Sequence, residues 1–554
     1  MRSSMNKAIG VLLVISAFVA GIAQAISIQS SVKDGDRLSG VVEIRVTVES
    51  QSTVNQVEFY VNGELRGTDA STPYTIKLDT VLEKEGPLSI EVGVYTASGD
   101  SKKFKISAVV DNGVSKGAEF HYQNALKFLQ VSKWEEAIQA CRIALKADET
   151  HYGARLAMAR SYLGMDVYDE AQKWAEDAYL TKETPEAAEL LSAIHVDRAF
   201  GIVSRSGERG EAMKEIANAF KASIAQKVAA IDLRIKALGP VTDANRLQHA
   251  DLLIQKNDYS AARRLLKEKY NQYEPDLALA NRLIYAAMRS GRMSEAWEVS
   301  LAVSKYGAPD AVTSALMAAG HAYYRRFDDA ANQLKEGVFS DPDSPTLMTA
   351  SAFVALRKGD RGAVQSQLAS MLQKSVTNPA VYYYLAILQF SLGQYMESRD
   401  NLRNAIVQNP LLYDCYVQRG YEALTLAESA VGDLAKDKPV LLDQAKEFME
   451  VALAAKPDSA EALNGLALVM LNLGKYDEAV RYADAASKAG PEYPWAFYTL
   501  SCALDRVRKT VEAQNAMNMA AKLDRDFLEG RGIPILKEAW TYTARNARLP
   551  ALSL

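Results

Sequence analysis

Hydrophobic and polar residues alternate along the chain between residues 26 and 112. The clearest run is Val42, Ile44, Val46 and Val48 set against Glu43, Arg45, Thr47 and Glu49. A period of two is typical of a strand with one buried and one solvated face, and it recurs around Val57, Ile90 and Phe104. Asn62-Gly63 is a tight-turn signal between two such runs. Roughly seven short strands in this stretch predict a two-sheet, immunoglobulin-like sandwich.

After residue 118 the pattern becomes helical and repeats with a fixed step. A small residue recurs every 34 residues, in two series: Ala262, Ala296, Ala330, Val364 and Ser398, then Ala445, Ala479 and Ala513. In most units a second small residue lies 12 positions earlier, at Ala125, Ala159, Ala250, Ala318, Ala352, Ala386 and Ala467. Small residues let two helices approach closely. The period therefore predicts antiparallel helix pairs stacked in a solenoid.

Aromatic residues and helix breakers follow the same period. A large ring stands three residues before the repeating alanine, as in Trp134, Tyr168, Tyr259, Phe327 and Tyr476. Residues three apart share one helix face. Prolines close several units and glycines mark the turns inside them, at Pro410, Pro457, Pro491, Gly291, Gly359, Gly393 and Gly474. The step from Ser398 to Ala445 is 47 residues, so we expect a loop or lengthened hairpin near residues 429–439.

These motifs resemble the tetratricopeptide repeat (TPR) family over residues 118–525. The best units are Ala118 to His151, Tyr152 to Pro185, Pro379 to Leu412 and Ala460 to Tyr493. Residues 186–242 are predicted to be helices without a clear repeat, and two units lack the expected aromatic residue, before Val364 and before Ala513. Residues 526–554 are expected to cap the exposed end of the array. The fold class is thus multidomain, an all-β sandwich followed by an all-α superhelical solenoid.

The strand-rich module is similar to bacterial immunoglobulin-like domains. The likeness rests on Leu38-Ser39-Gly40, on the run from Val57 to Gly63, on Gly67-Thr68-Asp69 and on the closing Val110-Asp111-Asn112. Such modules act as spacers or adhesive units in exported proteins, and many accompany carbohydrate-active enzymes. Residues 113–117 are small and polar and are predicted to form a linker.

The TPR resemblance implies a concave groove lined by the first helix of each unit. Carried over unit by unit, its candidate binding residues are Tyr122, Leu126, Arg160, Tyr285, Arg289, Tyr323, Phe353, Arg357, Tyr383, Phe390, Tyr421, Trp495, Tyr498 and Arg506. Aromatic residues and arginine dominate binding hot spots. The alternative is that many of these side chains pack between neighbouring helices.

Residues 1–25 have the pattern of a secretory signal peptide. Arg2 and Lys7 precede an uncharged stretch that ends in Ala23-Gln24-Ala25, a small-x-small sequence typical of a cleavage site. Gly10, Ser16 and Gly21 dilute the stretch, which favours cleavage over retention as an anchor. The predicted location is extracytoplasmic, periplasmic or secreted, with no stable transmembrane segment after cleavage.

Charge and cysteine usage narrow the expectations. The formal net charge is −4 with no evident basic face, so nucleic acid is not an expected partner. Cys141, Cys415 and Cys502 lie far apart among apolar helical neighbours, which favours structural burial over a reactive thiol.

No catalytic constellation is evident in the sequence. The five histidines are dispersed without metal-ligand spacing, and neither a nucleophile elbow nor a phosphate-binding loop is present. We therefore expect a non-enzyme without cofactor or metal. The leading hypothesis is an exported scaffold that binds a protein partner or extended peptide in the groove. The alternative is an accessory protein that handles or exports envelope polysaccharide.

Overall fold

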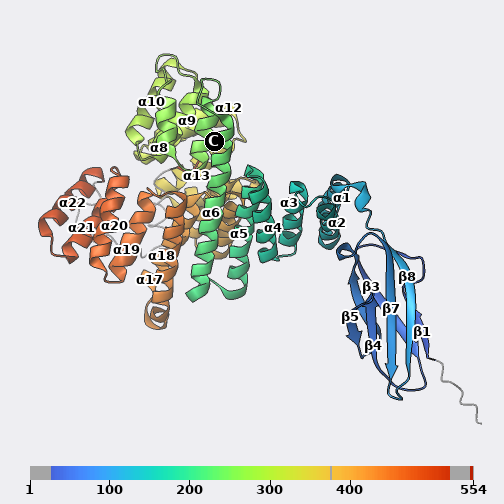
Figure 1. Ribbon diagram of the computed structural model, residues 1–554. Helices are drawn as coiled ribbons and strands as arrows, with labels where there is room; N and C mark the ends of the chain where they lie inside the picture. The colour runs from blue at the N-terminus through green and yellow to red at the C-terminus, as the bar shows by residue number, and fades with distance from the viewer. Residues whose placement is uncertain (1–25, 375–376, 525–549, 553–554) are drawn as a thin grey trace, which may run out of the picture. The chain divides into compact units, whose positions relative to one another are not determined.

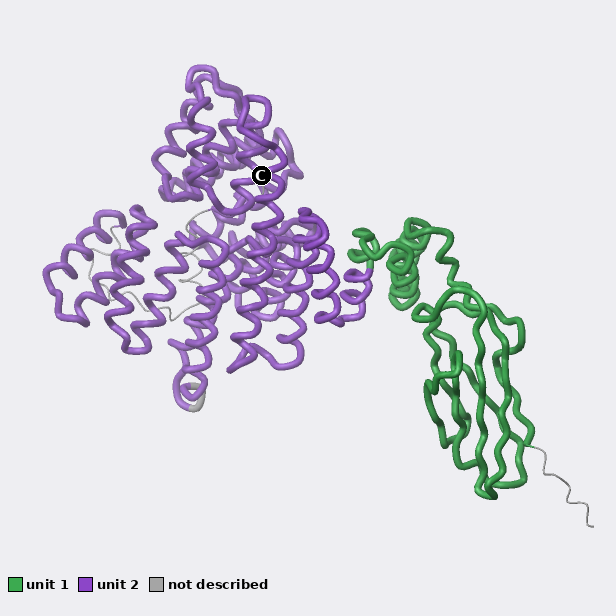
Figure 2. Tube along the Cα trace, in the orientation of Figure 1, with its two compact units in different colours: residues 1–157 green, residues 158–554 purple. Residues whose placement is uncertain are grey.

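The computed structural model describes residues 26–374, 377–524 and 550–552 (Figure 1). The chain divides into two compact units, Met1–Ala157 and Met158–Leu554 (Figure 2), which are described in turn. The predicted signal peptide lies outside the described residues, as do residues 526–549 of the predicted cap.

The first unit begins with a sandwich of eight strands, in place of the roughly seven expected. They are β1 (Ser27–Ser30), β2 (Arg37–Leu38), β3 (Val41–Glu49), β4 (Val54–Val61), β5 (Glu64–Asp69), β6 (Tyr74–Asp79), β7 (Gly86–Thr96) and β8 (Ser101–Val110). One sheet has the order β1-β3-β6 and the other β2-β8-β7-β4-β5. All pairs are antiparallel except β2 with β8.

Hydrophobic positions of the alternating pattern point into the sandwich, and the polar positions between them are exposed, as in β3. Ile44, Phe59 and Ile90 are each 0% exposed and belong to one core between the sheets. Asn62 and Gly63 join β4 to β5 with φ of 51° and 86°, the left-handed conformation that a two-residue hairpin turn requires. The predicted β-sandwich and its turn are thereby confirmed.

The first helical hairpin belongs to the same compact unit as the sandwich. It consists of α1 (Ala118–Gln130) and α2 (Trp134–Ala147), preceded by a 3₁₀ turn, Val114–Lys116, inside the predicted linker. Arg142 of α2 forms an ion pair with Asp79, and Lys146 Nζ donates to the Val81 carbonyl over 2.7 Å. These contacts fasten the hairpin to one end of the sandwich.

The remaining helices form a solenoid of antiparallel pairs. They are α3 (Tyr152–Gly164), α4 (Tyr168–Thr181), α5 (Pro185–Ser206), α6 (Gly210–Leu238), α7 (Arg246–Gln255), α8 (Tyr259–Lys267), α9 (Leu277–Arg289), α10 (Met293–Tyr306), α11 (Ala311–Tyr323), α12 (Phe327–Ser340), α13 (Pro345–Lys358), α14 (Arg361–Gln373), α15 (Pro379–Ser391), α16 (Tyr395–Gln408), α17 (Tyr413–Ser429), α18 (Lys438–Ala455), α19 (Ala460–Asn472), α20 (Tyr476–Ala489), α21 (Pro494–Arg506) and α22 (Thr510–Leu523). Among these described helices, none is long and apolar enough to cross a membrane.

The repeating small residues are where the helices pack. Ala262, Ala296 and Ala330 are 0% exposed, as are the earlier members of the pairs, such as Ala250 and Ala318. The aromatic residues three positions earlier begin the second helices, as Tyr259 begins α8 and Tyr476 begins α20. A left-handed turn residue recurs with the same period, at Ser132, Asp166, Asn257, Gly291, Arg325, Gly359, Gly393, Gly474 and Arg508.

The helices without a clear repeat form the longest hairpin and make a contact that the repeat pattern did not predict. The second of them, α6, packs against α18, more than two hundred residues further along the chain (Figure 1). Lys221 pairs with Glu450 at 2.9 Å, and Arg419 pairs with Glu208. The solenoid therefore returns onto itself, in addition to the sequential stacking that the period predicts.

The extra residues between the two repeat series lengthen one hairpin. α17 and α18 have 17 and 18 residues, and a 3₁₀ turn, Gly432–Asp437, joins them. Most other helices of the array have 13 or 14 residues. The predicted insertion thus extends both helices and their turn.

Candidate binding groove

The structure separates the fourteen predicted groove residues into a buried set and a partly exposed set. The buried set comes from the middle of the array and comprises Tyr285, Arg289, Phe353, Tyr383, Phe390 and Tyr421, each at most 7% exposed. The partly or fully exposed set comprises Tyr122, Leu126, Arg160, Tyr323, Arg357, Trp495, Tyr498 and Arg506. The buried set packs inside the unit, which agrees with the alternative that these side chains pack between neighbouring helices.

Arg289 illustrates why the middle of the array is closed. Its guanidinium, 1% exposed, donates to both carboxylate oxygens of Asp414 at 3.0 and 2.6 Å. The cation lies 5.3 Å from the ring centroid of Tyr259 and 4.8 Å from that of Tyr413. Burial lowers the pKa of Arg289, but Asp414 outweighs it and the net direction is upward. The charged pair therefore joins α9 to α17 rather than facing a partner.

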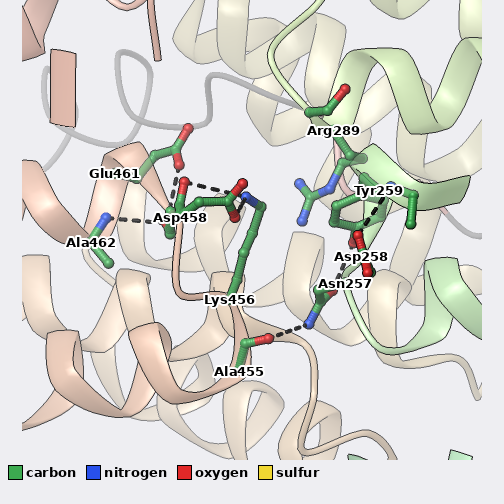
Figure 3. A network of polar contacts seen from close by, with 12 residues as sticks. Asn257, Asp258, Tyr259, Arg289, Ala455, Lys456, Asp458, Glu461 and Ala462 are labelled. Atoms are coloured by element: carbon green, nitrogen blue, oxygen red, sulfur yellow. Dashed lines mark hydrogen bonds and ion pairs between the residues drawn. The ribbon is translucent and has the colours of Figure 1, made fainter. Parts of the chain in front are cut away.

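A second set of polar contacts closes the same region (Figure 3). Asn257, in the left-handed turn before α8, donates its amide to the carbonyls of Leu411 and Ala455, at 2.8 and 3.1 Å. The Tyr259 hydroxyl donates back to Asn257 over 2.8 Å. A short polar side chain tolerates this backbone conformation and here donates to a loop carbonyl and to the carbonyl of the last residue of α18. These groups hold the array together.

An open cavity lies between helices of the last repeats. Its volume is about 380 Å³, and its walls come from α17, the start of α18, α19 and α21. The lining residues are Glu428, Lys438, Leu468, Leu471, Asn472, Tyr498, Thr499, Cys502 and Arg506. Two predicted groove residues, Tyr498 and Arg506, are among them. We call this cavity and its walls the α17–α21 groove.

Two polar groups of the groove lack a partner among the described residues. Glu428 accepts from the Asn472 amide at 3.1 Å through Oε1, while its buried Oε2 has no hydrogen bond. The hydroxyl of Thr499, whose side chain is 1% exposed, also has none. Burial raises the pKa of Glu428, and Asn472 and Lys438 offset part of that shift. Buried polar groups are almost always satisfied, so both atoms suit a ligand that supplies hydrogen-bonding groups.

One aromatic and two cationic side chains, Tyr498, Lys438 and Arg506, line the groove together with these polar groups. The rings of Trp495 and Tyr498 meet edge to face with centroids 5.8 Å apart. Arg506 is exposed and lies 5.8 Å from the ring centroid of Tyr476. An aromatic wall with a polar rim gives a large contact area at little entropic cost.

The other exposed candidates do not line this groove. Tyr122 belongs to the first unit, where its ring lies 5.1 Å from His151. Arg160 forms an ion pair with Glu186. The Tyr323 hydroxyl donates to the Glu492 carbonyl over 3.2 Å, and Arg357 lies 6.0 Å from the Tyr323 ring. Their predicted role in binding is not tested by these contacts.

The cysteines and histidines show no reactive arrangement in the described part of the chain. Cys141 and Cys415 are buried, whereas Cys502 is partly exposed at the groove. Burial raises the pKa of all three thiols, that of Cys141 to about 12. Over residues 26–374, 377–524 and 550–552, no three His, Cys, Asp or Glu side chains are grouped as metal ligands.

Comparison with known families agrees with both modules. Residues 26–92 match the bacterial Ig domain model, and residues 442–500 match the tetratricopeptide repeat model. The chain carries a bacterial Ig-like module and TPR repeats. The TPR match includes α19, α20 and the first half of α21, so it covers most of the groove lining.

The individual relatives either share little sequence identity with this chain or match only a small part of it. Human "DnaJ homolog subfamily C member 7" is 27% identical over 108 residues, which span 20% of each protein. The fibronectin(III)-like modules of Clostridium thermocellum CbhA match 16% of this chain and 94% of theirs, at 25% identity and a TM-score of 0.14. The APC/C hetero-tetramer Cut9–Hcn1 matches 79% of this chain and 82% of its own, at 13% identity and a TM-score of 0.38.

Proposed function

We propose that this protein is a non-catalytic scaffold that binds an extended segment of a protein partner in the α17–α21 groove. The observation that carries the proposal is the pair of unsatisfied buried groups, Glu428 Oε2 and the Thr499 hydroxyl, in a cavity walled by Tyr498. A peptide main chain offers both donors and acceptors, and aromatic walls accommodate its side chains. A TPR array is a fold typical of protein-binding scaffolds.

The proposed location is outside the cytosol. Its support is the sequence of residues 1–25, in which two basic residues precede an uncharged stretch ending in Ala-Gln-Ala. The partner is accordingly proposed to be a protein of the cell envelope or the extracellular space.

Site-specific photocrosslinking tests the proposed function. Tyr498→p-benzoylphenylalanine places the crosslinker in the groove wall, and Met519→p-benzoylphenylalanine places it on α22, where Met519 is 39% exposed. Irradiation of cell envelopes is expected to attach a protein to the Tyr498 variant and not to the Met519 variant. Equal adducts from both positions, or none from position 498, would contradict the proposal.

An envelope polysaccharide is the alternative ligand. The observation that favours it is the edge-to-face pair of the partly exposed Trp495 and Tyr498, because aromatic rings also stack on sugar rings. In the same experiment a glycan ligand would leave position 498 without a protein adduct. Retention of the protein on an immobilised envelope polysaccharide would then favour the alternative.

A further inference from the structure

Residues 550–552 lie inside the second unit, in the same hydrophobic core as helices much earlier in the chain. Ala551 is 1% exposed and Leu552 is 5% exposed, and both belong to the hydrophobic core that includes α15. The Ala551 main-chain N–H donates to the Tyr384 hydroxyl of α15 over 3.1 Å. The segment is therefore bound by its backbone and by two apolar side chains.

This mode of contact is that of a bound peptide. Chain segments outside helices and strands usually run over the surface with a solvated backbone. Here the Tyr384 hydroxyl accepts the main-chain N–H of Ala551, and the small Ala551 and the aliphatic Leu552 are both buried. Pro550 fixes φ near −65°, which suits an extended peptide.

The surface that contacts residues 550–552 is made of residues much earlier in the chain, among them Tyr384. Tyr384 is 0% exposed, and the charges of Asp414 and Arg289 both contribute to its pKa. Burial raises the pKa of Tyr384, and its hydroxyl oxygen accepts the Ala551 N–H. The ion pair that joins α9 to α17 thus lies close to this surface.

We propose that residues 550–552 are a tethered ligand of a second binding surface, a seat on α15 for an extended segment with a small residue followed by an aliphatic one. The seat is distinct from the α17–α21 groove, whose lining does not include Tyr384. A partner segment of the same chemistry competes with residues 550–552 for the seat. The inference stands whether or not the groove binds a protein.

A peptide-binding experiment on the full-length chain tests the seat. Leu552→Asp places a charge where Leu552 is buried and is expected to vacate the seat. A fluorescent peptide covering residues 547–554 should bind the Leu552→Asp protein at least tenfold more tightly than the unaltered protein, whose seat is occupied. In the vacated protein, Tyr384→Phe should weaken the peptide at least threefold, because the acceptor is lost while the ring remains.

Two further measurements make the outcome decisive. The same peptide with Ala551→Arg should not bind the vacated seat, whereas equal binding of both peptides would overturn the proposal. Amide exchange in the unaltered chain needs no variant, and Ala551 should exchange at least tenfold more slowly than in the free peptide. Exchange at the rate of the free peptide, or protection that appears only at high protein concentration, would overturn a seat filled by the chain's own segment.

Discussion

Arg289→Ala is expected to lower the free energy of unfolding of the helical-repeat unit by about 3–5 kcal/mol, because it leaves a buried carboxylate without its partner. Asp414 is 11% exposed and receives both of its guanidinium hydrogen bonds from Arg289. The stacked rings of Tyr259 and Tyr413 lose their cation at the same time. Urea unfolding followed by the circular dichroism of the helices measures the change.

Arg282→Ala is the matched control for this prediction. Arg282 also binds a carboxylate through two hydrogen bonds, to Asp251 at 2.6 and 3.0 Å, but the two side chains are 30% and 40% exposed. A partly solvated pair contributes about 0–1 kcal/mol. If both substitutions lowered the unfolding free energy equally, Arg289 would not be the internal clamp described above.

Phe353→Ala is expected to cost about 3–5 kcal/mol of unfolding free energy, since it removes a ring from a closed core and leaves a cavity. Phe353 is 0% exposed in α13. Phe339→Ala makes the same chemical change in α12, where the ring is 95% exposed, and should change stability by no more than about 0.5 kcal/mol.

The same pair of variants separates a core role from a binding role for Phe353. The TPR resemblance placed Phe353 in the partner groove, whereas its burial places it inside the unit. A Phe353→Ala protein as stable as the Phe339→Ala protein, but defective in partner capture, would restore the groove assignment. Thermal and urea unfolding of both variants decide between the two.

Local periodicity was sufficient to predict the elements and much of the core. The alternation around Ile44 and the 34-residue step of the alanines both mark buried positions, of which Ile44 and Ala262 are 0% exposed. A helix face or strand face is decided by neighbours a few positions away. The sequence therefore predicted the sandwich, the hairpins and the lengthened turn.

Contacts between helices that are far apart in the sequence could not be predicted in this way. Arg289 and Asp414 are 125 residues apart, and no period links them, so a groove rule applied unit by unit counted Arg289 as accessible. The same applies to α6 against α18. The only local hint was the divergence of residues 186–242 from the repeat, which marks a segment with a different packing surface.

The polar half of the groove was missed for a related reason. Glu428 lies in the extension of α17 beyond the usual helix length, where the repeat register no longer applies. Thr499 lies one residue beyond the predicted Tyr498, and Cys502 was interpreted as a structural buried thiol. An acidic residue directly before the insertion, on the same helix as the predicted groove residue Tyr421, was the available signal.

The reactivity of Cys502 tests the central claim, that a partner segment occupies the α17–α21 groove, most directly. Cys502 lines the cavity while Cys141 and Cys415 are buried, so the native protein offers one accessible thiol. Burial raises the pKa of the Cys502 thiol, and alkylation is therefore measured at mildly alkaline pH, where more of the reactive thiolate forms.

With the partner captured at position 498 added in saturating amount, the alkylation rate of Cys502 should fall at least tenfold. A rate that is unchanged when the partner is bound would contradict occupation of the groove.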